Sequence, residues 1–312
     1  MEIHTSIENI SHIKKPVVTT GTFDGVHMAH KAILKRLRLL ADQIEGSSVL
    51  ITFYPHPRKV LYPESAGKEL QMINTQNEKA TLLQQTKLDH VIIIPFTKAF
   101  SAISSQQFVK EFLVDKLQVK RIVVGFNHYF GHNREGNYTY LNQLKNHFNF
   151  DVEELPKQDL QNETISSTKI RNAIQEGNIQ RANAYLSHYY FIQGTIISGE
   201  KKQLDVSVTL WKIDCGIEEK LLPPEGVYAI STIVNKNIYK GMAFITNSGN
   251  QRNKHLLKNT FVYLFDFYED VSGLEIIVNF HTCIRSEDIF SDNTDIQTQI
   301  YYDRKHIETL IY

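Results

Sequence analysis

Two histidines three residues apart, His27 and His30, occur in the segment GTFDGVHMAHKAILKRL. A run of β-branched residues precedes this segment and a helical pattern follows, so both histidines are expected where a strand turns into a helix. The unpaired N–H groups and the dipole of a helix N-terminus attract anions, but the dipole contributes only about 0.3–1 kcal/mol. Both imidazoles could donate hydrogen bonds to phosphate oxygens. A phosphate site is favoured, and a metal site or a solvated helix start remain alternatives.

Two further segments follow predicted strands. TFYPHPRKVL places His56 and Arg58 directly after a strand, with a proline on each side of the histidine to fix the loop. GFNHYFGHNREG is rich in glycine and aromatic residues, as expected for a loop that holds a flat heterocycle. Either segment alone could be structural.

A fourth segment, ISSTKIRNAIQEG, has three hydroxyl residues at a predicted helix start, with Lys169 and Arg171 in its first turn. Hydroxyl residues there are usually caps. Cations at a helix N-terminus oppose the dipole and therefore indicate a bound anion. Four such segments in one domain favour a nucleotide site over chance.

The elements that must position these residues alternate between strands and helices. The patterns predict strands over 17–23, 48–53, 91–96 and 121–126, and helices over 30–44, 104–117, 138–148 and 178–186. Strands that are apolar on both faces and separated by helices imply a parallel sheet, which binds ligands beyond the carboxyl ends of its strands.

The second half of the chain has a different texture. After residue 190 five strand-like runs follow one another, and the only helical pattern lies at 294–311. This pattern predicts a small β-barrel closed by one helix. The predicted domains are therefore residues 1–186 and 187–312.

Composition narrows the class of protein. The 312 residues are 42% hydrophobic and 22% charged, as in globular proteins, and 34 Lys and Arg balance 34 Asp and Glu. This balance argues against a nucleic-acid binder. Cys215 and Cys283 lack metal-ligand or redox spacing, and no apolar run approaches the roughly 18 residues of a membrane span. A cytoplasmic protein without membrane or nucleic-acid partners is expected.

The four segments, in this order, resemble the signature segments of the FMN adenylyltransferase module of prokaryotic bifunctional riboflavin kinase/FAD synthetases. YFIQGTIISGEKK, LLPPEGVYAI, IYKGMAFIT and FVYLFDFYED resemble the layout of the family's riboflavin kinase barrel. The resemblance covers nearly the whole chain. It implies an α/β fold, with a Rossmann-like nucleotidyltransferase domain followed by a smaller riboflavin-kinase-like β-barrel and a C-terminal helix.

The resemblance also implies an activity: transfer of AMP from MgATP to the phosphate of FMN, giving FAD and pyrophosphate. Such a reaction needs in-line positioning and neutralisation of crowded negative charge. Magnesium would be held mainly by the ATP phosphates, with no direct protein ligand. The implied catalytic residues are His27, His30 and Arg171; the implied ATP-binding residues are Gly21, Phe23, Asp24, Gly25, Ser166, Ser167 and Thr168; the implied flavin-binding residues are His56, Arg58, Phe126, Asn127 and Phe130.

The chain departs from the family pattern in both halves. Ala29 stands where the family usually has glycine between the histidines. In the second half, EKKQLDVSVTLWKID lacks the family's Pro-Thr and Asn, and Thr209 does not restore them. Phe261 occupies the place of the glutamate base. Because a general base alone contributes about 10²–10⁴ in rate, an inactive kinase half is expected.

Alternatives remain open from the sequence. In a shifted register Glu269 or Glu275 would serve as base and the protein would be fully bifunctional, and Arg285 with Glu287 resembles the family's R-x-E. A non-catalytic flavin-binding protein and an enzyme that adenylates another substrate are further possibilities. The sequence does not predict an oligomeric state.

Overall fold

The computed structural model describes residues 1–7, 10, 12–160, 163–205, 208–216, 219–247, 258–286 and 296–311, with side chains for all of these except 198–205, 208, 247, 296 and 297. The chain forms two compact units. The first comprises residues 1–70 and 79–165, and the second comprises residues 71–78 and 166–312. The boundary at residues 78 and 79 falls inside one helix, α3 (Gln76–Gln84).

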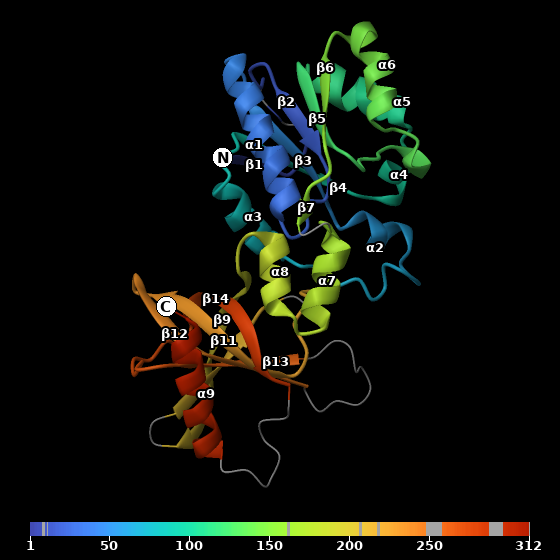
Figure 1. The fold of residues 1–312 in the computed structure, drawn as a ribbon. Helices are drawn as coiled ribbons and strands as arrows, with labels where there is room; N and C mark the ends of the chain where they lie inside the picture. The colour runs from blue at the N-terminus through green and yellow to red at the C-terminus, as the bar shows by residue number, and fades with distance from the viewer. Residues whose placement is uncertain are drawn as a thin grey trace. The chain divides into compact units, whose positions relative to one another are not determined.

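A six-stranded sheet in the order β1-β4-β3-β2-β5-β6 forms the centre of the first unit (Figure 1). Every neighbouring pair is parallel. The strands are β1 (Glu2–His4), β2 (Val17–Thr20), β3 (Ser48–Tyr54), β4 (His90–Pro95), β5 (Arg121–Gly125) and β6 (Asp151–Leu155). All four residues of β2 are buried, which confirms the expectation of a sheet covered on both faces.

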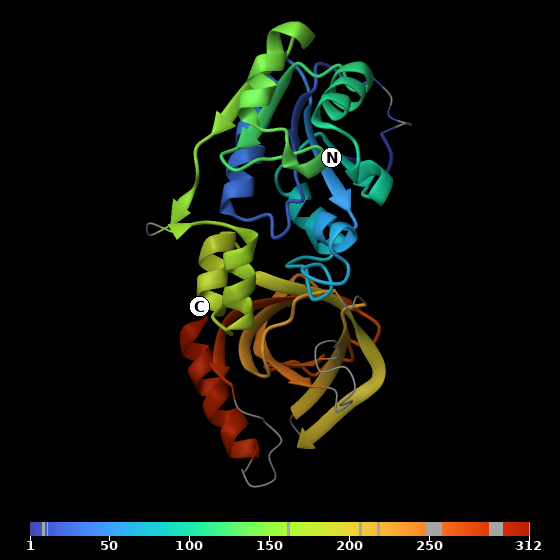
Figure 2. The same cartoon turned by 90° about the vertical axis from the view of Figure 1, so that its right-hand side faces the viewer.

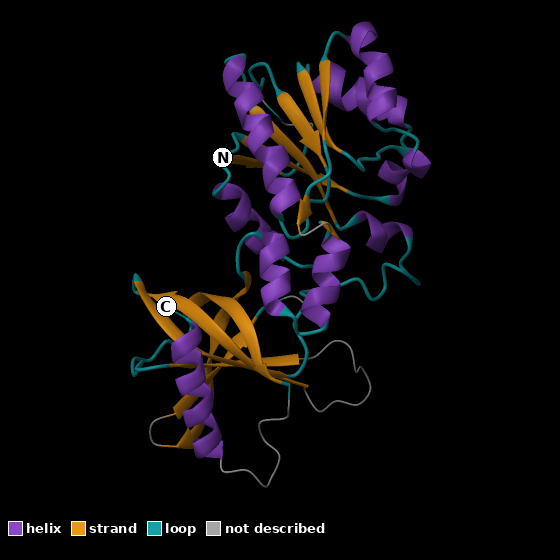
Figure 3. Cartoon of the chain, in the orientation of Figure 1, coloured by secondary structure: helices purple, strands orange, loops and turns teal. Residues whose placement is uncertain are grey.

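Helices flank this sheet on both sides (Figure 3). They are α1 (Met28–Gln43), α2 (Pro57–Leu61), α4 (Lys98–Ser101), α5 (Ser105–Gln107) and α6 (Tyr138–Phe148), with a π-helix (Phe108–Lys116) and a 3₁₀ turn (His132–Arg134). A small hairpin of β7 (Asp159–Leu160) and β8 (Glu163–Thr164) ends the unit. Leu34, Leu37 and Leu40 are buried on α1, as their spacing predicts.

After segment 71–78, the second unit contains α7 (Ser167–Gln175) and α8 (Ile179–Leu186) and continues as a closed antiparallel barrel in the order β10-β13-β12-β11-β14-β9 (Figure 2). Its strands are β9 (Tyr190–Asp205), β10 (Val208–Asp214), β11 (Gly226–Val234), β12 (Asn237–Asn247), β13 (Lys258–Leu264) and β14 (Glu275–Arg285), followed by α9 (Ile296–Leu310). Ile300 and Ile307 of α9 join Leu210 and Phe244 in one apolar cluster. The predicted barrel with its C-terminal helix is thus confirmed.

Several elements escaped sequence prediction. β1 has only three residues, and β6 (DVEEL) is an edge strand whose charges hide its alternation. α3 is polar along most of its length. β10 lies in the segment EKKQLDVSVTLWKID, for which the sequence pattern predicts no strand. The predicted helix 104–117 is a short α-helix that continues as a π-helix. Among the described residues no helix is long and apolar enough to span a bilayer.

A buried ion pair within the second unit joins Lys220 to Glu78, whose side chains are 1% and 0% exposed. The Lys220 Nζ donates to Glu78 Oε2 at 2.7 Å and to the carbonyl oxygens of Ile73 at 2.7 Å and Phe191 at 2.8 Å. Glu78 Oε1 accepts the backbone N–H of Gln193 at 2.9 Å. Because every donor of the ammonium is paired, desolvation of the two charges is compensated, and segment 71–78 is fastened to β9.

We expect Lys220→Met to lower the free energy of unfolding of the second unit by about 3–5 kcal/mol, because Glu78 would stay buried without its cation. Urea denaturation followed by fluorescence of Trp211, the single tryptophan and a barrel residue, measures this. Arg304→Met, which removes ion pairs to the exposed Asp266 and Glu308, is the control and should cost at most about 1 kcal/mol. Equal losses in both variants would contradict the prediction.

Candidate active site

Three of the four segments leave neighbouring strands at the same edge of the sheet. β2 lies between β3 and β5, and the glycine turn, the PHPR segment and the GFNHYFG segment follow these three strands directly. After β2 the chain forms β3 and β4 on one side of it and then returns to form β5 on the other side. The carboxyl edge of β2 is therefore a topological switch point. Open α/β sheets bind their ligands at such points.

The turn between β2 and α1 has strained backbone geometry. Gly25 has φ 89°, which favours glycine, but Phe23 with φ 50° and Val26 with φ 37° also lie in the left-handed region. A β-branched residue is rarely found there, and surrounding packing must hold it. Val26 is fully buried, and a Cβ on Gly21 would lie 3.0 Å from the Phe23 ring. The strain brings Asp24 and His27 inward, where they are 2% and 5% exposed.

His27 and His30 form a stacked pair at the start of α1. Their ring centroids are 3.6 Å apart, and the Phe23 ring stacks on His30 at 4.4 Å. His27 is the N-cap, and its Nδ1 accepts the backbone N–H of His30 at 3.4 Å. Neutral His27 therefore carries its proton on Nε2, where it can be donated to a ligand. The sequence predicts both histidines at the start of the helix, and the structure places His27 as its N-cap and His30 in its first turn.

His30 is held neutral by its surroundings. Burial, followed by the nearby His27 and Lys79, holds the pKa of His30 well below its ordinary value of 6.5. Its Nδ1 is buried and has no hydrogen-bond partner among the described residues. A buried polar atom without a partner is costly, so this nitrogen is suited to accept or donate a hydrogen bond when a ligand enters.

Lys79 on α3 is a site residue that sequence reasoning missed. It is 6% exposed, and its Nζ donates to the Thr22 carbonyl at 3.4 Å and to Thr52 Oγ1 at 3.3 Å. Burial lowers the pKa of Lys79 to about 8, and the Asp24 carboxylate offsets part of that shift. A buried ammonium whose described hydrogen bonds go to the neutral oxygens of Thr22 and Thr52 is a candidate for binding an anion. The only signal in the sequence was a lysine beside the apolar ATLL.

The PHPR segment forms a cap and a short helix instead of a loop. His56 is the N-cap of α2, and its Nδ1 accepts the backbone N–H of Arg58 at 3.2 Å. Arg58 is exposed. The flavin-side role of both residues stays a prediction.

The GFNHYFG segment combines exposed and buried rings. Phe126 is 53% exposed and Asn127 is exposed, so both are accessible to a ligand. Phe130 instead packs against Phe108 of the core, with centroids 5.8 Å apart, and covers Gly136. Thr20 Oγ1 lies 3.0 Å from His128 Nε2, and burial lowers the pKa of His128 to about 4.

The ISSTKIR segment opens α7 in the second unit. Ser166 is its N-cap, with Oγ 3.3 Å from the Lys169 backbone nitrogen, which is the ordinary structural role of such a residue. Ser167 and Thr168 are the first two helical residues. Arg171 lies in the second turn, not the first as predicted, and its Nε donates to the Gln71 carbonyl at 2.9 Å. The predicted meeting of this segment with the two histidines stays a prediction.

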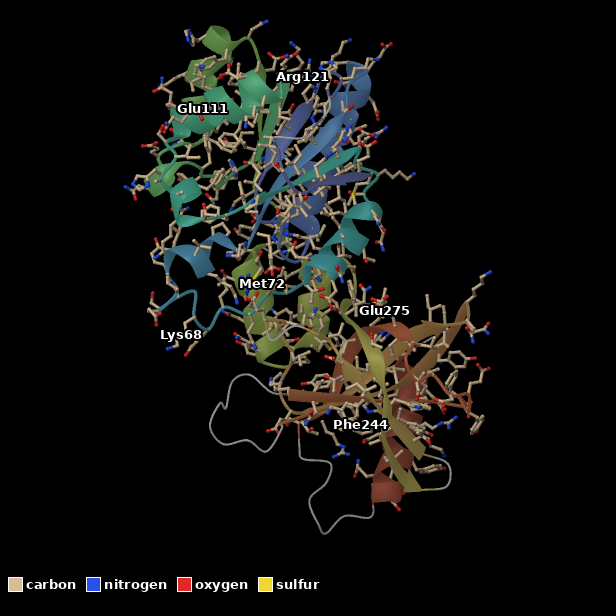
Figure 4. All side chains as sticks on the ribbon, turned by 180° about the vertical axis from the view of Figure 1, so that it is seen from behind. Lys68, Met72, Glu111, Arg121, Phe244 and Glu275 are labelled. Atoms are coloured by element: carbon tan, nitrogen blue, oxygen red, sulfur yellow. The ribbon has the colours of Figure 1, made fainter. Side chains whose placement is uncertain are left out.

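The kinase-related positions lie on the barrel. Phe261 packs against the apolar cluster of Leu210 and Phe244. The alternative bases are exposed: Glu269 accepts from Asn235 at 3.3 Å, and Glu275 (Figure 4) accepts from Gln193 at 2.8 Å.

The R-x-E motif formed by Arg285 and Glu287 is described only in part. Arg285 donates to Asp303 of α9 at 2.9 Å. Glu287 and the side chains of 200–208 lie outside the described residues.

Comparison with known proteins decides the family. Residues 9–169 match the FAD synthetase family model and residues 186–311 match the riboflavin kinase model. A bifunctional riboflavin kinase/FMN adenylyltransferase of Listeria monocytogenes is 32% identical over 93% of this chain and 90% of its own length. The chain belongs to the family of bifunctional riboflavin kinase/FMN adenylyltransferases. The relative of the same name in Bacillus subtilis is 30% identical over 93% of this chain and 91% of its own length.

A solved structure shares the fold of this family member. A Streptococcus pneumoniae protein described as a macrolide-efflux protein superposes with a TM-score of 0.87, covering 98% of each chain at 23% identity. Identity at this level supports the fold alone.

We expect His128 to titrate with a midpoint near 4 in an NMR titration of the imidazole signals, because its burial disfavours the charged form. Since the unfolded chain binds this proton more readily than the folded one, stability should be lost as pH falls from about 6.5 towards 4. The spectrum of His128→Gln lacks the signal of His128 and so assigns it. This variant should also lose less stability than the unmodified chain over the same pH range. A midpoint at or above 6.5 would contradict the burial argument.

Proposed function

We propose that this chain is an FMN adenylyltransferase that transfers AMP from ATP to FMN. A phosphate oxygen of FMN attacks the α-phosphorus of ATP, the bond from that phosphorus to the pyrophosphate oxygen breaks, and FAD and pyrophosphate leave. The observation that carries the proposal is the stacked His27–His30 pair at the start of α1, on the switch-point edge of the sheet.

The proposed mechanism relies on positioned donors. His27 offers its Nε2–H, and His30 offers a buried nitrogen that needs a partner. The Lys79 ammonium donates to the Thr22 carbonyl in the same turn, is close enough to lower the pKa of His30, and supplies the positive charge that two neutral imidazoles lack. Such fixed donors in a buried setting stabilise charge that develops on the α-phosphate during transfer. By family resemblance Ser167, Thr168 and Arg171 bind the triphosphate, and Phe126, Asn127, His56 and Arg58 bind the flavin.

Magnesium would enter with ATP. Within the described residues no group of three His, Cys, Asp or Glu ligands surrounds the histidine pair. By family resemblance this ion would be held mainly by the phosphate oxygens of ATP. When bound, it would screen the phosphate charge.

We further propose that residues 187–312 form a separate functional domain that does not phosphorylate riboflavin. Neither Pro-Thr-x-Asn nor a glutamate at the Phe261 position is present in this region of the sequence. The apolar packing of Phe261 supports this proposal. The relatives carry bifunctional names, and retention of the kinase activity is the competing hypothesis.

One assay tests both halves. The purified chain is incubated with MgATP and either riboflavin or FMN, and the flavins are separated. We expect FAD from FMN and no FMN from riboflavin. FMN from riboflavin would reject the loss of the kinase, and no product from either substrate would favour a non-catalytic flavin-binding protein.

Substitution of the histidines tests their role. His27→Asn and His30→Asn should each lower kcat for FAD formation by about 10²–10³, the usual cost of losing one donor to a transition state. His147→Asn on α6 is the matched control and should leave the rate unchanged. Equal rates in all three variants would exclude the pair from catalysis.

Lys79→Met should lower kcat/KM for ATP at least tenfold while the thermal midpoint stays equal or rises, because the buried charge destabilises the fold. In the unmodified chain kcat/KM for ATP should fall above about pH 8, where the free enzyme loses the Lys79 charge. Lys79→Arg, which stays charged, should move this decline to higher pH.

The exposed Lys35 on α1 supplies the control. Lys35→Met removes the same charge from the same unit and should change neither kcat/KM nor its pH dependence. If Lys79→Met behaves like Lys35→Met, Lys79 has no part in ATP binding.

A further inference from the structure

A cluster of two imidazoles and one carboxylate lies on the first unit, away from the switch-point edge. Glu2 and His4 alternate on β1 and so share one face of that strand, and Glu2 is in register with His90 on the parallel strand β4. Because Glu2 and His90 open their strands, the cluster lies at the amino ends of β1 and β4, whereas the histidine pair lies beyond the carboxyl ends. The proposed transfer reaction makes no use of these residues.

The three donor atoms stand at the separations of metal ligands. His4 Nε2 lies 3.2 Å from His90 Nδ1, and Glu2 Oε2 lies 3.8 Å from the first and 3.5 Å from the second. The nearest point equidistant from all three atoms lies in their plane, about 2.0 Å from each, and an ion slightly out of that plane would lie at about 2.0–2.2 Å from each. Zinc binds imidazole nitrogen and carboxylate oxygen at about 2.0–2.2 Å.

We propose that Glu2, His4 and His90 form a zinc site that fastens the edge strand β1 to β4. Two imidazoles with one carboxylate suit zinc, whereas magnesium and calcium prefer oxygen ligands. The imidazole side chains are 18% and 17% exposed and that of Glu2 is 71% exposed, so an ion can enter from solvent and water can complete the tetrahedron.

Zinc competes with a direct contact between the rings. At 3.2 Å one of the two facing nitrogens donates a hydrogen to the other. When both nitrogens bind zinc, that hydrogen moves to the other nitrogen of its own ring, so neither imidazole gains charge. The ion then replaces one weak ring-to-ring hydrogen bond by three ligand bonds that join a three-residue strand to its neighbour.

The gain would be largest for β1 because it is short and has a partner on one side only. A three-residue edge strand makes few backbone hydrogen bonds and opens readily. A ligand that binds only the closed arrangement stabilises it in proportion to its concentration over its dissociation constant. The expected role of zinc is therefore to hold the edge of the sheet.

The test uses the full chain without a polyhistidine tag, stripped with a chelator and titrated with zinc chloride in a calorimeter. One equivalent should bind, and an excess of magnesium chloride should not compete. His4→Ala and His90→Ala should each weaken binding at least tenfold, and Glu2→Gln should weaken it less. His12→Ala, which removes an exposed histidine of the same unit, should leave binding unchanged.

Two spectroscopic readouts complete the test. Cobalt should give the visible absorption of a tetrahedral ion in the unmodified chain and lose it in His90→Ala. Zinc should slow amide hydrogen exchange in the peptide that contains β1. The site would be overturned if the unmodified chain bound no zinc, or if His4→Ala and His90→Ala bound zinc as tightly as the unmodified chain. Unchanged exchange in β1 would overturn its fastening role. None of these measurements depends on adenylyltransferase activity.

Discussion

The position of β2 between β3 and β5 is the constraint on which the site depends. In a parallel sheet all strands end at the same edge, so segments that lie about 30 and 100 residues apart in sequence converge. β2 is buried along its whole length, and its register to both neighbours leaves the glycine turn no freedom to move away. The strained torsions of Phe23 and Val26 are consistent with a turn held in place by this packing.

Burial then determines the charge state of the site. Burial lowers the pKa of His30 and His128 and so keeps both imidazoles neutral. It also lowers the pKa of Lys79, so that its ammonium loses a proton more readily. Buried ionisable groups that cost stability in the free protein are common at sites that bind a charged ligand. Two neutral imidazole donors and one buried ammonium suit a phosphate group whose charge grows during transfer. They suit a transition metal less well, because Lys79 would repel it.

The barrel packs through residues other than those that a riboflavin kinase site would need. Its core is built from apolar side chains such as Phe244, Phe280 and Tyr228, none of which needs to bind a substrate to pack. Phe261 adds to that packing. Because packing and chemistry use different residues, a match to the riboflavin kinase model establishes the family and the fold, while activity depends on a few positions.

The sequence by itself determined the alternation of strands and helices, the barrel, and the family, because apolar periodicity and short motifs are local properties. It located His27, His30 and the glycine turn at the start of a helix, but not the buried Lys79 near them. Only the tertiary structure showed that Lys79 is buried beside Thr52, that Glu78 pairs with Lys220, and that Glu2, His4 and His90 lie together. Each joins residues distant in sequence, and burial and distance between such residues arise only when the strands pair and the helices pack.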